Sequence, residues 1–95
     1  MEFDEFEQSL ARNEPPAELS AALRALWHDA KGNWERAHEL AQSQRDAAGS
    51  WFHAYLHRVE GDESNAGYWY GRAGKTHSQA PLKEEWAEIV AALLA

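Results

Sequence analysis

The chain contains no cysteine among its 95 residues. It therefore has neither a disulfide framework nor thiolate chemistry. A domain of this length buries only about 60–65% of the surface that its unfolded chain exposes, so its core must be dense. The five tryptophans, three tyrosines and three phenylalanines are the side chains that can supply such a core.

Basic residues are also few, with 9 Lys and Arg against 16 Asp and Glu, and the formal net charge is −7. Affinity for nucleic acids and for anionic membranes depends on Lys and Arg, so neither is an expected partner. No apolar run approaches the roughly 20 residues that a membrane-spanning helix needs. The acidic first residues, Met1 to Glu7, are the opposite of a targeting segment. We expect a cytoplasmic protein.

One motif occurs twice, 29 residues apart. A glycine and a helix-capping residue stand near the centre of each copy, which is typical of a helical-hairpin repeat. The corresponding pairs are Ala25 and Ala54, His28 and His57, Gly32 and Gly61, Asn33 and Asp62, and Ala37 and Ala66.

Apolar residues recur at helical spacing, and no stretch alternates with period two, so the sequence predicts an all-α fold. Two antiparallel hairpins are expected at about 17–44 and 50–73 of a single domain. A short helix carrying Phe3, Phe6 and Leu10 precedes them. A final helix at about 81–94 is expected to cap the open end of this short repeat.

Each unit resembles a tetratricopeptide or Sel1-type repeat over residues 17–74. The pattern has a small residue in the first helix, a glycine at the turn, an alanine five residues later, and an aromatic residue four beyond that. These positions hold Ala25, Gly32, Ala37 and Ala41 in the first unit, and Ala54, Gly61, Ala66 and Tyr70 in the second. The sequence departs from the pattern in its period, in the missing closing proline and at Ala41. The resemblance implies a protein-interaction scaffold. Residues 51–73 also look like part of short bacterial-type proteins, which implies no activity.

His53, His57 and Glu60 have the spacing that places three side chains on one helical face, expected opposite the apolar stripe of the same helix. Two imidazoles and a carboxylate suit a zinc site with an open position for water. The motif of metal-dependent hydrolases has a glutamate directly after its first histidine, where this chain has Ala54, so the usual general base is missing. The alternative is packing, because His57 corresponds to His28 and both neighbour small residues at a helix seam.

Tyr68 and Arg72, together with His53, are expected to line a groove that holds a peptide carboxylate or a small anion, since Arg offers a planar fork of donors. In the alternative interpretation, Tyr68 packs against a flanking helix and Arg72 pairs with an acidic neighbour. Gly67 and Gly71 lie within the same predicted helix, which indicates the close approach of another helix.

His38 and His77 are interpreted as surface residues, with Trp34 as the neighbour of His38.

These features predict a module that binds a protein or peptide on a concave helical surface, and a homodimer would enlarge that surface. The contact residues would be Tyr55, His57, Tyr68, Arg72 and His53. No cofactor is expected in that case. The alternative is a metal-binding protein or a small metal-dependent hydrolase that uses His53, His57 and Glu60 with zinc. A third possibility is a structural subunit of a larger assembly.

Overall fold

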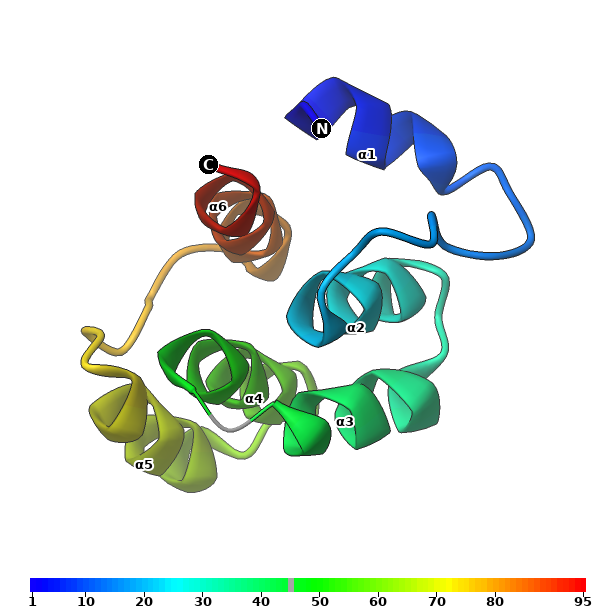
Figure 1. Cartoon of the computed structure of the whole chain (residues 1–95). Helices are drawn as coiled ribbons and strands as arrows, with labels where there is room; N and C mark the ends of the chain where they lie inside the picture. The colour runs from blue at the N-terminus through cyan, green and yellow to red at the C-terminus, as the bar shows by residue number, and fades with distance from the viewer. Residues whose placement is uncertain (45) are drawn as a thin grey trace.

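A computed structural model describes residues 1–44 and 46–95, and within these ranges the chain forms six helices and no strand (Figure 1). The predicted all-α class is confirmed. None of the described helices is long and apolar enough to cross a membrane. The helices are α1 (Phe3–Ser9), α2 (Ala21–Ala30), α3 (Trp34–Ser43), α4 (Ala47–Val59), α5 (Glu63–Ala73) and α6 (Leu82–Leu94).

The duplicated motif corresponds to two turns of the same geometry, one between α2 and α3 and one between α4 and α5. Gly32 and Gly61 have φ angles of 84° and 81°, a conformation that residues with a Cβ rarely adopt. Asn33 and Asp62 follow them as N-caps, and each side chain accepts a 3.2 Å hydrogen bond from the backbone N–H three residues further on. The repeat in the sequence therefore specifies two helical hairpins with the same turn.

Two helices begin at other residues than expected. The first long helix begins at Ala21 and not near residue 17, because the Ser20 side chain accepts the backbone N–H of Leu23 and caps the helix there. Helix α4 begins at Ala47 and not near residue 50, because Asp46 caps it in the same way.

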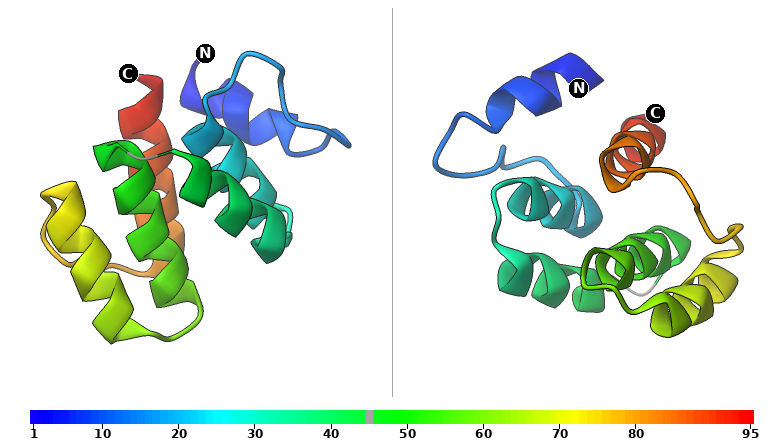
Figure 2. Two further views of the ribbon diagram at one scale, coloured as in Figure 1. Left: turned by 60° about the horizontal axis from the view of Figure 1, so that its bottom comes forward. Right: turned by 180° about the vertical axis from the view of Figure 1, so that it is seen from behind.

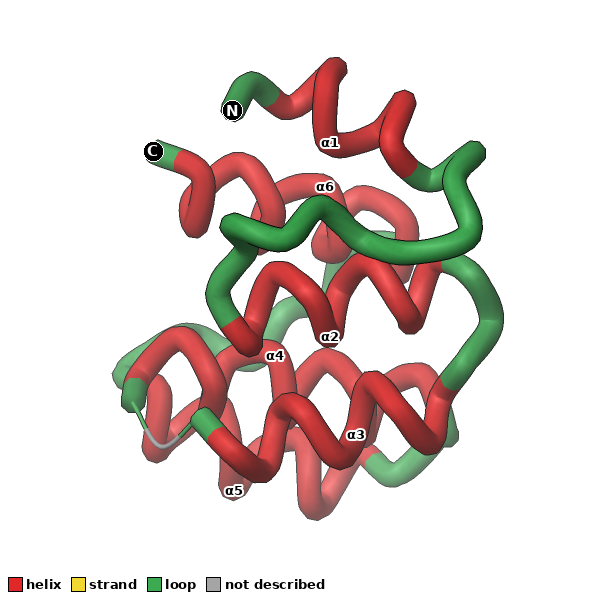
Figure 3. Tube along the Cα trace, turned by 45° about the vertical axis from the view of Figure 1, so that its right-hand side comes forward, coloured by secondary structure: helices red, strands yellow, loops and turns green. Residues whose placement is uncertain are grey.

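Helices α2 and α4 form the middle of the molecule, with α3 and α5 on one side and α6 on the other (Figures 1 and 2). Helix α1 lies beyond α6 (Figure 3), and its Phe3 and Phe6 rings pack against Trp86 of α6. The Trp86 indole N–H donates to the Leu26 carbonyl of α2 at 3.0 Å. Helix α6 therefore lies across the first helices of both hairpins, and does not simply extend the stack beyond α5.

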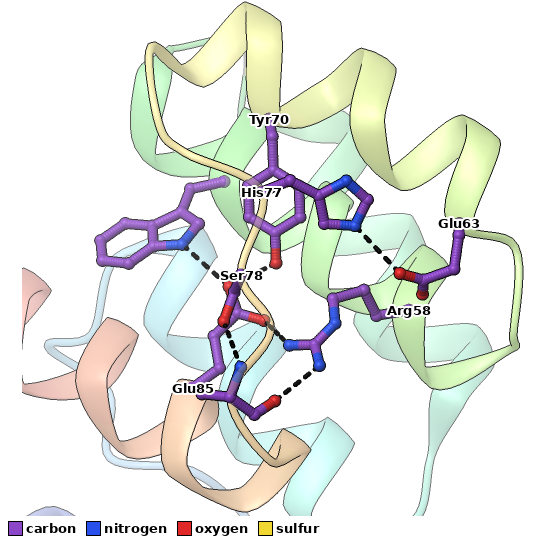
Figure 4. Close-up of polar contacts among 8 residues, drawn as sticks. Arg58, Glu63, Tyr70, His77, Ser78 and Glu85 are labelled. Atoms are coloured by element: carbon purple, nitrogen blue, oxygen red, sulfur yellow. Dashed lines mark hydrogen bonds and ion pairs between the residues drawn. The ribbon is translucent and has the colours of Figure 1, made fainter.

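One buried carboxylate joins α6 to the second hairpin (Figure 4). Glu85 is only 1% exposed and accepts hydrogen bonds from the Arg58 guanidinium at 2.6 Å, the Tyr70 hydroxyl at 2.5 Å and the Trp51 indole at 3.3 Å. Arg58 also donates to the Ala80 carbonyl at 2.6 Å. Burial and the neighbouring carboxylate raise the pKa of Tyr70 well above its usual range, so its hydroxyl remains a donor. The carboxylate is thus fully partnered.

Removing Arg58 tests this network. We expect Arg58→Ala to lower the free energy of unfolding in urea by about 3–5 kcal/mol, because it leaves the Glu85 charge buried without a cation. Arg36→Ala is the matched control, since its ion pair with Glu39 is exposed and should contribute less than about 1 kcal/mol.

Adding Glu85→Gln to an Arg58→Met variant should recover part of the loss, because no unpaired charge then stays buried. Equal losses for Arg58→Ala and Arg36→Ala would contradict the proposed importance of this contact.

Candidate functional site

Three histidines from two helices meet between α3 and α4. His38 comes from α3, and His53 and His57 come from α4; one ring nitrogen from each lies within 4.8 Å of the others. The Nε2 atoms of His38 and His53 are 3.2 Å apart. His38, interpreted as a surface residue, is half-buried and lies against His53. His53 lies on the side of α4 that faces α3 and α5, and this side is covered, so His53 is only 7% exposed.

Two tryptophans hold the rings in place. Trp69 of α5 stacks on His53 with centroids 4.0 Å apart, and His57 stacks on the same imidazole at 5.1 Å. Trp34 stacks on His38 at 4.7 Å, as its proximity in the sequence suggested. The His38 ring stands nearly perpendicular to that of His53, at 87°. Each ring that could bind a metal is thus braced by an aromatic neighbour.

Glu60 has a different role from the predicted one. Its carboxylate oxygen lies 2.6 Å from Nδ1 of His57. A proton on Nδ1 would be shared with Glu60, and this arrangement leaves the Nε2 lone pair free. The side chain that completes a set of three nitrogen ligands is His38, which the sequence did not connect with the other two.

A second group of possible ligands, His57, Glu60 and Asp62, lies at the end of α4. The Asp62 carboxylate is already engaged, because it caps α5 and accepts hydrogen bonds from the Asn65 backbone and side chain. Glu60 is engaged by His57. We therefore regard these carboxylates as parts of the turn and as support for His57.

The neutral state of the His53 ring favours metal binding. Burial, with a smaller contribution from the neighbouring His38 and His57, lowers the pKa of His53 to about 4. At neutral pH the imidazole is therefore neutral. A neutral imidazole offers a lone pair to a metal without first losing a proton.

The geometry suits a tetrahedral ion. Zinc binds histidine nitrogen at about 2.0–2.1 Å, which places two ligand nitrogens of a tetrahedral site about 3.3 Å apart. The separation of 3.2 Å between His38 and His53 agrees with this spacing. One ring nitrogen of His57 lies within 4.8 Å of those of His38 and His53. The His57 ring is stacked on that of His53 at an interplanar angle of 7°, so it would have to turn for its lone pair to point at the same ion. A fourth position would remain open.

A groove of about 430 Å³ adjoins His53. Within it, Arg72 lies over the Trp69 ring at 5.4 Å from the ring centroid. Tyr68 is 58% exposed and lies outside the lining, but its hydroxyl accepts a 3.3 Å hydrogen bond from Arg72. The lining residues are Ala41, Gln42, Gln44, Gly49, Ser50, His53, Trp69 and Arg72.

Tyr55, a predicted contact residue, is 5% exposed and lies in the core. It is therefore not part of an accessible binding surface in this arrangement.

His77 is a second histidine interpreted as a surface residue, and it instead packs against α5. Its ring stacks on Tyr70 at 4.8 Å and its Nε2 lies 3.0 Å from Glu63 (Figure 4).

A Cβ atom at Gly67 would lie 3.6 Å from the His77 ring, so the close neighbour of Gly67 is a loop and not a helix. Among the described residues, nothing comes within 4 Å of a Cβ at Gly71.

Comparison of the chain with models of protein families, with curated proteins and with solved structures finds no match. The likeness to tetratricopeptide and Sel1-type repeats remains a prediction from the sequence.

The environment of His53 can be tested by titration. We expect the His53 imidazole resonances, followed by NMR in metal-free protein, to titrate with a pKa of about 4, because burial disfavours the charged ring. A midpoint near the ordinary histidine value of about 6.5 would contradict the buried position of this ring.

Proposed function

We propose that the protein binds one divalent transition-metal ion of the zinc class through His38, His53 and His57. The observation that carries this proposal is the convergence of three imidazole nitrogens within 4.8 Å. Imidazole ligands suit zinc, copper, nickel and iron, and three of them form a common zinc-binding set. The Nδ1–H of His57 would donate a hydrogen bond to Glu60, which would orient the ring, as carboxylates do beside metal-bound histidines.

Packing alone accounts less well for this cluster. Nitrogens that face one another at 3.2 Å can share a single proton, so His38 and His53 satisfy only one hydrogen bond between them. A bound cation would use the lone pairs of both rings at once. The partial exposure of His38 and His57 provides a route by which the ion can enter.

The proposal does not extend to hydrolysis. In the hydrolases with the H-E-x-x-H motif, a glutamate acts as general base beside the metal-bound water. Glu60, the C-cap residue of α4, is engaged by His57, and Ala54 stands where the hydrolase motif has its glutamate.

Calorimetry with zinc and metal-stripped, untagged protein tests the proposal. We expect one ion per chain at micromolar affinity or better. His38→Ala and His57→Ala should each weaken zinc binding by at least about 100-fold, because each substitution removes one of the three protein ligands and leaves only two histidines. Glu60→Gln should weaken it by about 10–100-fold through the orientation of His57.

His28→Ala is the matched control. His28 occupies the position in the first hairpin that His57 has in the second, and its ring packs against Trp27 away from the cluster. Zinc affinity should be unchanged in this variant. Zinc binding that is unaltered in His38→Ala would contradict the metal site. If the parent protein binds no zinc and His38→Ala or His57→Ala lowers the melting temperature, the cluster has a packing role instead.

A further inference from the structure

We propose that the groove beside His53 binds the C-terminal carboxylate of a peptide through Arg72, and that a metal ion at the three histidines strengthens this binding. The carboxylate site stands on its own observations. The coupling between the two sites rests on the proposed metal-binding function.

Arg72 is the cation that such a site requires. No carboxylate of the described residues lies within ion-pair distance of its guanidinium, although the chain has 16 acidic side chains. Trp69 and Tyr68 support the guanidinium at 5.4 and 6.0 Å from their ring centroids. A braced, unpaired guanidinium can donate two parallel hydrogen bonds to a carboxylate.

The other lining residues fit a peptide end. Gln42 and Ser50 offer an amide and a hydroxyl, and neither side chain has a hydrogen-bond partner in the part of the chain that the structure describes. Such groups can pair with the last peptide bond of a ligand. The net charge of −7 opposes ligands that carry several negative charges, whereas a C-terminus carries one.

His53 belongs to both sites. Its Nε2 faces His38, and its Nδ1 has no hydrogen-bond partner among the described residues. A metal bound at Nε2 requires the proton of this neutral ring to be on Nδ1, so the ring becomes a fixed donor. Because the His53 ring lines the groove, that donor is available to a carboxylate there. Reciprocal linkage then requires the carboxylate to strengthen metal binding by the same factor.

The probes are acetyl-Ala-Phe with a free carboxylate, its C-terminal amide, and amidated acetyl-Asp-Phe, which places a carboxylate on a side chain. Binding to the full chain is followed by NMR chemical shifts, first with EDTA and then with one equivalent of zinc. With EDTA we expect the free carboxylate to bind at least about tenfold more tightly than either amidated peptide. Zinc should increase its affinity by about 5-fold or more.

Arg72→Gln should remove the preference for the free carboxylate. Lys75→Gln is the matched control, because Lys75 is a nearby cation that lies over Trp51 and does not line the groove. Equal binding of the free acid and its amide, or no effect of Arg72→Gln, would overturn the carboxylate site. Equal binding of amidated acetyl-Asp-Phe would overturn the assignment to a C-terminus.

The two proposals fail separately. If calorimetry detects no zinc while acetyl-Ala-Phe still binds in EDTA through Arg72, the metal site is wrong and the carboxylate site stands. If zinc binds but leaves the peptide affinity unchanged, the coupling through His53 is wrong.

Discussion

The buried carboxylate of Glu85 is the contact on which the arrangement of the helices depends. It draws the guanidinium of Arg58, the hydroxyl of Tyr70 and the indole of Trp51 to one point, and so connects α4, α5 and α6. A buried charge is favourable only when it is paired and its hydrogen bonds are satisfied. Because the donors come from different helices, this requirement fixes where α6 can lie. It also holds α4 and α5 together at a position that helix packing alone would leave less defined.

Helix α4 presents different chemistry on different sides. Trp51 and Arg58 reach the Glu85 carboxylate, while His53 and His57 meet His38 of α3. The candidate metal site is therefore built on an element that its other contacts hold rigid. Rigid support of this kind is what a set of ligands needs in order to converge on one ion. Helix α6 covers the shared face of α2 and α4, whereas the groove beside Trp69 is open.

Local patterns predicted most of the fold. The repeated Gly32 and Gly61, each followed by a capping residue, specify the two turns, because a positive φ and an N-cap are properties of a few residues in sequence. The position of α6 was not predictable in this way. Its apolar stripe fits either the end of the stack or the middle helices, and the choice depends on a hydrogen-bonded ion pair between residues 27 positions apart.

The candidate site was predictable only in part. The spacing of His53 and His57 places them on one helical face. His38 joins them only because α3 packs on α4, and the spacing of residues along the chain does not predict that packing. Glu60 lies near His57 as expected, and one of its carboxylate oxygens is 2.6 Å from Nδ1 of that imidazole. Tyr55 lies in the core with Asp29 of α2 near its hydroxyl, a neighbour that spacing along α4 does not reveal.

X-ray absorption spectroscopy of the protein loaded with one equivalent of zinc tests the central claim most directly, because it counts the ligands of the ion. The account predicts three imidazole nitrogens at about 2.0–2.1 Å and one oxygen from water. The number of imidazole ligands should fall to two in His38→Ala. A coordination sphere of oxygens, or three imidazoles that persist in His38→Ala, would contradict it.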